Sequence, residues 1–207
     1  MLKSKGIIKA NPSSQIKRNK SIMDYIHNLI SIDYYFFNYI DSLQMQRLRN
    51  LYEVPSCRYA FPSAIHRRFE HSIGTFYLAN KFLKTLIENH NVNKIPLEIT
   101  PKIRNTVLLS ALTHNIGYGP FGNTFDDFCK EDLKLEDNNF QSRAVLIFEN
   151  LLNEKGIEPE SLKEDESFDL KILNNIISGK SKNEKYYEQI VNKNLTGIDA
   201  NIFDSIR

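Results

Sequence analysis

The sequence predicts an all-α protein, a bundle of helices packed around one core. Two observations carry this prediction: apolar residues recur at three- and four-residue spacing over long stretches, and helix-capping residues stand at the ends of those stretches. The chain has 207 residues, of which 41% are hydrophobic and 25% are charged. This composition is typical of one soluble domain that is large enough to bury a core.

The boundaries of the expected helices are read from capping chemistry. Thr100 followed by Pro101 is typical of an N-cap with proline in the first turn, and the apolar stripe that follows runs to His114. Gly156 and Gly179 end two later helices, because glycine readily adopts the left-handed conformation that terminates a helix. In chain order, the expected helices cover residues 23–28, 33–51, 68–89, 101–114, 142–155, 168–177 and 184–192. The expected connections include residues 55–65, 130–139 and 158–166.

Charge and cysteine content limit which partners and which cellular compartment are expected. Residues 1–19 are basic and polar, without the apolar centre of a signal peptide, and we expect a flexible segment before a helical core over residues 20–207. A net charge of +2 does not indicate nucleic acid as a partner, so any anion site must be local. Cys57 and Cys129 have no ligand-like spacing, which favours a reducing compartment. No apolar run approaches the roughly 20 residues of a membrane helix, so we expect an intracellular protein, in cytoplasm or nucleus, with no membrane partner.

Three segments, in order along the chain, resemble motifs of the HD-domain phosphohydrolases. They are IDSLQMQRLR (40–49), FPSAIHRRFEHSIG (61–74) and ALTHNIGYGPF (111–121), which are similar to the family patterns IDTPxFQRLR, (F/Y)PGAxHxRFEHSLG and HD(I/L)GHGPF. A fourth segment, GIDANIFD (197–204), follows where the family has DxDxxDY. On these motifs the chain is identified as a member of the dNTP triphosphohydrolase branch, which includes the sterile-alpha-motif and HD-domain enzymes and the bacterial dGTPases. The resemblance implies an HD-domain helical bundle that lacks the family's C-terminal part.

The resemblance also implies a metal site in which two aspartates are replaced. The family holds a divalent metal with two histidines and two aspartates, which match His71, His114, Asn115 and Asn201. Asparagine keeps the shape of aspartate but brings no negative charge, so the site loses two charges that would offset a divalent ion. We therefore expect no resident cofactor; Mn, Mg, Fe or Zn are the candidates if the site still functions. Packing between helices is the alternative role for the two histidines. The other histidines without a partner pattern, expected at the surface, are His27 and His90.

The groups that the family uses for proton transfer are changed as well. Tyr118 and Asn123 stand where the family has histidines, and neither a phenol nor an amide is a good general acid near pH 7. A third family histidine corresponds to Phe140 or a neighbouring asparagine. Two residual catalytic candidates remain by resemblance: Asp126, which still matches the family, and Arg68, which matches an arginine that contacts substrate phosphates.

A nucleotide site is implied by Asp41, Gln46, Arg49 and Arg68. The first three match residues that read guanine at the activator site of the animal enzymes, so dGTP or GTP is the expected ligand. The alternative is structural, with the arginines of this region paired to the neighbouring carboxylates of Glu53, Glu70 or Asp41.

Three functions from different classes are consistent with this pattern. The favoured one is a catalytically inactive HD-domain relative that binds a nucleotide or a protein partner in a regulatory role. The second is an active metal-dependent dNTP (dGTP) triphosphohydrolase, or another nucleotide phosphohydrolase. The third is a subunit of a homo-oligomer, or of a hetero-oligomer with an active HD-domain homologue.

Overall fold

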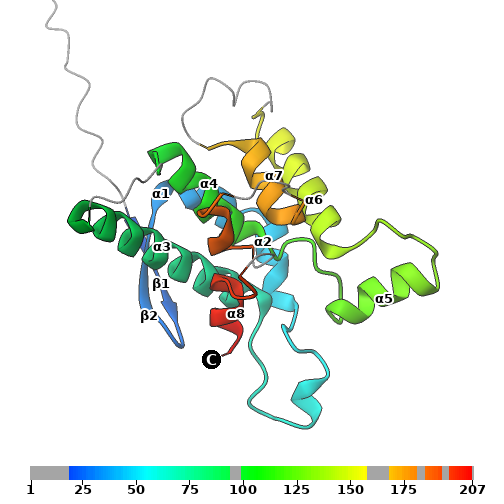
Figure 1. Cartoon of the computed structure of the whole chain (residues 1–207). Helices are drawn as coiled ribbons and strands as arrows, with labels where there is room; N and C mark the ends of the chain where they lie inside the picture. The colour runs from blue at the N-terminus through cyan, green and yellow to red at the C-terminus, as the bar shows by residue number, and fades with distance from the viewer. Residues whose placement is uncertain (1–18, 94–98, 158–167, 181–184, 193–195, 207) are drawn as a thin grey trace, which may run out of the picture.

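In the computed structural model, the chain forms a mostly helical body with one small β-hairpin (Figure 1). The structure describes residues 19–93, 99–157, 168–180, 185–192 and 196–206, so nearly all of the basic segment 1–19 and all of the connector 158–166 lie outside the described residues. The predicted all-α class is confirmed, with the hairpin as an addition. The elements are β1 (Asn19–Asp24), β2 (Asn28–Asp33), α1 (Tyr34–Ile40), α2 (Leu43–Arg47), α3 (Arg68–Asn93), α4 (Pro101–Thr113), α5 (Asn123–Glu131), α6 (Phe140–Glu154), α7 (Leu170–Ser178) and α8 (Ala200–Ser205).

The hairpin corrects the sequence analysis, which expected a helix over residues 23–28. Strands β1 and β2 pair antiparallel on either side of a tight turn. The Asp24 carboxylate accepts hydrogen bonds from the backbone N–H groups of Ile26 and His27 at 2.9 and 2.7 Å. Asn28, which follows, adopts a positive φ of 59°. Aspartate and asparagine suit these two turn positions, so turn chemistry overrides the apparent helical spacing.

The longer helices lie where capping chemistry predicts them. The Thr100 side chain accepts a hydrogen bond from the N–H of Ile103 at 3.2 Å and so begins α4. Gly179 ends α7 in the left-handed conformation, with a φ of 66°. Helix α6 begins slightly earlier than expected, because the Asn139 side chain accepts from the N–H of Ser142 at 2.8 Å.

The shorter elements differ from the expectation. The helix expected over 33–51 is divided at Ser42, which has an extended backbone and caps α2 by accepting from the N–H of Met45 at 3.3 Å. Helices α5 and α8 have no counterpart in the sequence analysis; α8, with six residues, is too short to show a clear helical period. Within the described part of the span 184–192, the structure has a 3-10 turn at Glu188–Ile190 instead of a full helix.

Packing brings the functional segments together around α3 and α4. Helix α3 packs against α4 and α8, and α7 packs against α4 and α6. Every residue of α4 from Thr106 to Thr113 is buried, so this helix is central and its C-terminal end lies in the protein interior. The start of α3, the end of α4 and the short α8 therefore meet, whereas α5 stands away from the other helices (Figure 1). Among the described residues, no helix combines the length and apolar character that crossing a membrane requires.

Candidate functional site

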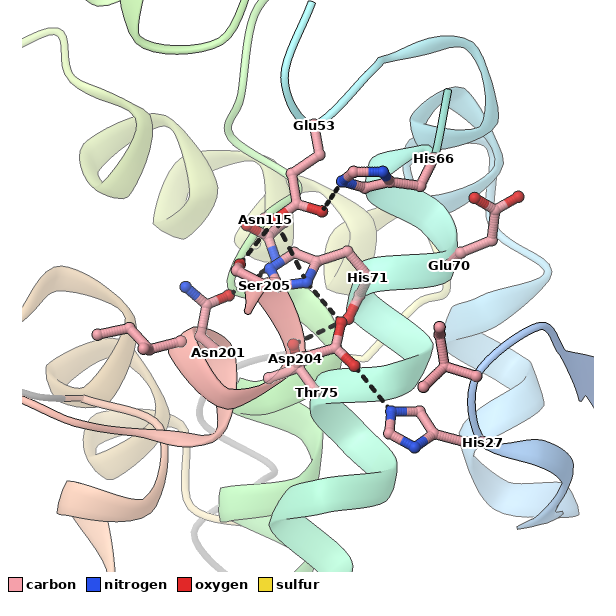
Figure 2. Close-up of polar contacts among 12 residues, drawn as sticks. His27, Glu53, His66, Glu70, His71, Thr75, Asn115, Asn201, Asp204 and Ser205 are labelled. Atoms are coloured by element: carbon pink, nitrogen blue, oxygen red, sulfur yellow. Dashed lines mark hydrogen bonds and ion pairs between the residues drawn. The ribbon is translucent and has the colours of Figure 1, made fainter. Parts of the chain in front are cut away.

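His71, in the first turn of α3, is the centre of a buried polar network (Figure 2). Its side chain is 2% exposed. Its Nε2 lies 2.7 Å from Oδ1 of Asn201, and its Nδ1 lies 2.6 Å from Oδ2 of Asp204, both on α8. Asn115, just after α4, donates to the same Asn201 oxygen at 3.5 Å. The structure thus brings together three of the four residues that the family resemblance assigns to the metal.

The fourth of these residues, His114, follows the last residue of α4 and faces an aromatic stack. Its ring meets the ring of Phe140 nearly edge-on, with centroids 5.7 Å apart. Phe140 in turn stacks on Tyr118, with centroids 4.1 Å apart and an interplanar angle of 12°. Tyr118, which the resemblance places where the family has a histidine, is therefore joined to Phe140 in an aromatic contact.

The donor set around His71 does not fit a divalent metal. Both ring nitrogens face oxygen atoms, Nδ1 that of Asp204 and Nε2 that of Asn201. The nitrogen that faces Asn201 is engaged in that hydrogen bond, and the two asparagines contribute no charge against a divalent ion. Within the described ranges, moreover, no three His, Cys, Asp or Glu side chains are grouped so as to hold a metal ion.

Sequence reasoning missed three residues that complete this network. Asp204, which is fully buried at 0% exposure, also lies 2.9 Å from Nε2 of His27 in the hairpin turn. His27 is therefore not the partnerless surface residue that the sequence suggests. Glu53 accepts a hydrogen bond from Ser205 at 2.7 Å and lies 3.6 Å from Nδ1 of His71. A signal was present only for Asp204, which matches the last aspartate of the family's DxDxxDY pattern.

Arg68 is buried, with 6% of its surface exposed, and its side chain contacts other residues of the protein. Its guanidinium carbon lies 3.4 Å from the ring centre of Tyr118, and its Nη2 donates to the backbone carbonyl of Glu53 at 3.1 Å. Burial lowers the pKa of the Arg68 guanidinium, and the neighbouring Tyr118 and Glu53 oppose that shift. Burial also raises the pKa of the Tyr118 phenol, against the effect of the Arg68 charge. The sequence analysis considered an ion pair between Arg68 and the Glu53 carboxylate. The structure instead shows Arg68 donating to the backbone carbonyl of Glu53.

Asp126, the other residual catalytic candidate, forms an ion pair with Arg143 on α6. Its second carboxylate oxygen accepts the backbone N–H of Phe140 at 2.9 Å. Arg143 also donates to the backbone carbonyls of Gly117 and Asn138, at 2.9 and 2.6 Å. Both oxygens of Asp126 are therefore engaged, and Arg143 joins α5, α6 and the segment after α4.

Three of the four predicted nucleotide-binding residues, Asp41, Gln46 and Arg49, form a second, more exposed cluster, in which Asp41 lies beside the hairpin. Arg49 donates from Nε to the side-chain oxygen of Gln46 at 2.7 Å, and its guanidinium carbon lies 3.6 Å from the ring centre of Phe69. Asp41, whose side chain is 61% exposed, lies 3.7 Å from Nζ of Lys20 on β1. Lys20 is a further residue that sequence reasoning missed, because only the hairpin brings it beside Asp41. Arg68 belongs to the buried stack and not to this cluster.

Known proteins resemble most of the chain. It is 31% identical over 193 residues to the deoxynucleoside triphosphate triphosphohydrolase SAMHD1 homolog of Dictyostelium discoideum, covering 92% of this chain and 36% of that protein. It is 30% identical over 181 residues to a putative HD domain-containing protein of Acanthamoeba polyphaga mimivirus, covering 80% of this chain and 37% of that protein. With human deoxynucleoside triphosphate triphosphohydrolase SAMHD1, the identity is 29% over 213 residues, with coverages of 89% and 32%.

The chain spans about a third of the length of these curated relatives. No family model matches it. The similarity nevertheless covers 80% or more of this chain for each of these three relatives. By these relatives and its helical fold, the chain belongs to the HD-domain, dNTPase-like family.

Proposed function

We propose that this protein is a catalytically inactive HD-domain protein that binds a nucleotide, dGTP or GTP, in a regulatory role. The observation that carries the proposal is the engagement of both residual catalytic groups within the protein itself. Asp126 is paired with Arg143 and with the backbone N–H of Phe140, and Arg68 is stacked on Tyr118.

Hydrolysis of a triphosphate requires groups that are positioned to transfer protons and to contact phosphate oxygens. A carboxylate with both oxygens engaged is not placed to deliver or accept a proton. Tyr118 cannot take over, because its raised pKa keeps the phenol neutral near pH 7. For Arg68 to contact a phosphate, its stack on Tyr118 would have to open. The geometry therefore supports loss of turnover for two reasons: no group is placed to transfer a proton, and Arg68 is not free to contact a phosphate.

Nucleotide binding has separate support from the exposed cluster of Asp41, Gln46, Arg49 and Lys20. It combines a carboxylate, an amide and two cations, which together can pair with a purine edge and with phosphates. Several relatives are named as deoxynucleoside triphosphate triphosphohydrolases, which makes nucleotides the natural ligand class. A protein that retains this cluster and lacks turnover is suited to sensing a nucleotide.

A turnover assay tests the proposed loss of catalysis. The wild-type protein should hydrolyse dGTP no faster than a His114→Ala variant, in the presence of manganese or magnesium. One well-placed acid or base is worth about 10²–10⁴-fold in rate, so a working site would be detected easily. An active SAMHD1 relative serves as the positive control. Clear hydrolysis that disappears in His114→Ala would overturn the proposal.

A binding assay tests the nucleotide site independently of turnover. Calorimetric titration with dGTP and GTP should give measurable affinity, and Asp41→Asn should weaken it by about 10–100-fold, because hydrogen bonds to charged groups contribute about 1.5–3 kcal/mol. Asp127→Asn is the matched control, since Asp127 is an exposed aspartate on α5, apart from this cluster. Equal affinity for wild type and Asp41→Asn would remove the proposed nucleotide role from this cluster.

The second candidate function is an active metal-dependent dNTP triphosphohydrolase. It is favoured by the names of the relatives and by the retention of His71, His114 and Asp126. The turnover assay separates it from the first. A third candidate, a subunit that joins an active HD-domain homologue, is tested by co-purification with a longer homologue.

A further inference from the structure

Five side chains around His71 form a chain in which imidazoles and carboxylates alternate (Figure 2). Successive nitrogen–oxygen distances along it are 3.1, 3.6, 2.6 and 2.9 Å. In spatial order the members are His66, Glu53, His71, Asp204 and His27. They come from the loop before α3, the segment after the 3-10 turn at Leu48–Asn50, α3, α8 and the hairpin turn. The alternating chain therefore joins segments that are far apart in the sequence.

Its central members are buried, and burial strengthens a polar contact between a ring nitrogen and a carboxylate oxygen. Asp204 is held between His71 and His27, and Glu53 lies between His66 and His71. In the interior, removal of one partner is costly because the other polar group is left without its contact.

We infer that this alternating chain fixes α8 on α3, as a divalent metal at the family's site would, and that it also ties the hairpin turn to α8. Asp204 and His27 are the positioning residues, because they hold the His71 ring from the side opposite Asn201. The inference follows from the finding that the side chains around His71 do not fit a divalent metal, because it names the contacts that hold these helices in its place. It is independent of the proposed function, since it concerns how the site is held and not whether dGTP is hydrolysed.

The size of α8 makes such an anchor necessary. A six-residue helix is not stable in isolation, so packing and side-chain contacts must hold it. Phe203 contacts Phe82 of α3 at a centroid distance of 5.8 Å, on the partly exposed side of α8. Ala200 and Asp204 are the fully buried residues of α8, and of these two Asp204 has the polar side chain. Removal of its carboxylate should therefore loosen the whole helix.

Gly74 provides an independent sign that α3 is adapted to the Asp204 carboxylate. A β-carbon at position 74 would lie 2.0 Å from Oδ1 of Asp204. Glycine in a helix interior is usually destabilising by about 1 kcal/mol relative to alanine. Its presence in α3 is explained by the close approach of the carboxylate, which alanine would prevent.

Thermal unfolding of four variants tests the inference. Asp204→Asn should lower the Tm by on the order of 10 °C, since it breaks a buried charged contact in a domain of this size. Gly74→Ala should lower the Tm, although the same change in an ordinary helix raises it. His27→Ala should lower the Tm, and His27→Gln should recover part of the loss, because the glutamine amide places an N–H donor near the position of Nε2. Asp127→Asn, an exposed aspartate on α5, is the control and should change the Tm little.

Two further measurements separate a positioning role from a merely structural one. Addition of EDTA or of manganese should leave the wild-type Tm unchanged. In long-range proton–nitrogen NMR spectra, the Nδ1 signal of His71 should move in Asp204→Asn and not in Asp127→Asn. The inference is overturned if EDTA lowers the wild-type Tm as much as Asp204→Asn does, or if Asp204→Asn and Gly74→Ala both behave like the control. If Asp204→Asn does not fold, the comparison of His27→Ala with His27→Gln decides: equal Tm values would overturn it.

Discussion

At the scale of single residues, the exchange of carboxylate for amide at positions 115 and 201 changes the charge of the site more than its shape. The oxygen of Asn201 is placed to meet His71 Nε2 at 2.7 Å, a hydrogen-bonding distance. The motifs alone point to this gathering of side chains. They do not indicate that Asp204 supplies the remaining charge, because its contacts depend on the position of α8 against α3.

Restoring the two carboxylates should restore metal binding without restoring much hydrolysis. Asn115→Asp combined with Asn201→Asp adds two negative charges beside His71, and aspartate fits where asparagine fits. We expect the manganese affinity to rise by more than about 100-fold in a calorimetric titration, given the strength of close charge pairs at partly buried sites. The turnover of dGTP should stay near that of the wild type, because Asp126 and Arg68 remain engaged.

The control is a triple variant that adds His71→Ala to the two aspartates. It should abolish the gain in manganese affinity. Unchanged manganese affinity in the double variant would mean that the contacts around Asn201 cannot open to admit an ion. Strong hydrolysis would instead mean that the change from histidine to Tyr118 is tolerated by the chemistry.

Tyr118 should make the protein sensitive to alkaline pH. Burial raises the pKa of its phenol, so the neutral form stabilises the fold, fully below the unfolded pKa of about 10 and progressively less as the pH rises through the folded pKa. Between about pH 8 and about pH 10.5, the wild type should therefore lose more stability to urea than Tyr118→Phe does. Tyr25→Phe is the control, since Tyr25 is 97% exposed. Equal losses in wild type and Tyr118→Phe would contradict this assignment.

At the scale of secondary-structure elements, sequence reasoning succeeded where a helix is long and capped and failed where an element is short. Helix α4 begins at the predicted cap, because a local hydrogen bond from Ile103 to Thr100 determines its start. The hairpin was misread as helix, although Asp24 and Asn28 carry the turn signal. Helix α5 depends on a distant partner, Arg143, and no local pattern could reveal that dependence.

Loss of the Arg143 side chain should release α5. Arg143 pairs with Asp126 and holds the backbone at Gly117, so Arg143→Ala leaves a half-buried carboxylate without its cation. We expect a loss of about 3 kcal/mol in the free energy of unfolding, together with faster hydrogen exchange over α5. Lys171→Ala, an exposed cation on α7, is the matched control. Slow exchange over α5 in Arg143→Ala would show that other contacts position the helix. A gain in dGTP turnover would show that Arg143 alone blocks Asp126.

At the scale of the whole molecule, two clusters with different chemistry are joined by one hairpin. Strand β1 carries Lys20 of the exposed cluster that we propose binds a nucleotide, and the turn carries His27, which contacts Asp204 on α8. The motifs predicted only part of each cluster: His71, Asn115 and Asn201 of one, and Asp41, Gln46 and Arg49 of the other. Their connection was not predictable, because it depends on Lys20 and His27 of a hairpin that was misread.

This connection predicts that nucleotide binding stabilises α8 as well as the hairpin. At about 100 times the dissociation constant, a bound nucleotide contributes about 2.7 kcal/mol, which corresponds to a rise in Tm of roughly 5–10 °C for a chain of this size. Part of this stabilisation should pass through His27 to Asp204. Hydrogen exchange over residues 200–205 should therefore slow when GTP is added, although the cluster that binds it lies on other elements.

The variant His27→Ala separates direct protection from transmitted protection. With His27 removed, GTP should still slow exchange over β1, because Lys20 and Asp41 are intact, but it should no longer slow exchange over α8. Asp41→Asn should reduce both effects at the same GTP concentration, since its affinity for the nucleotide is expected to be about 10–100-fold lower. If α8 remains protected by GTP in His27→Ala, the two clusters communicate through the body of α3 instead. If GTP does not slow hydrogen exchange over α8 even in the wild type, the hairpin does not couple the two clusters. The proposed regulation by a nucleotide would then act at the surface of the hairpin.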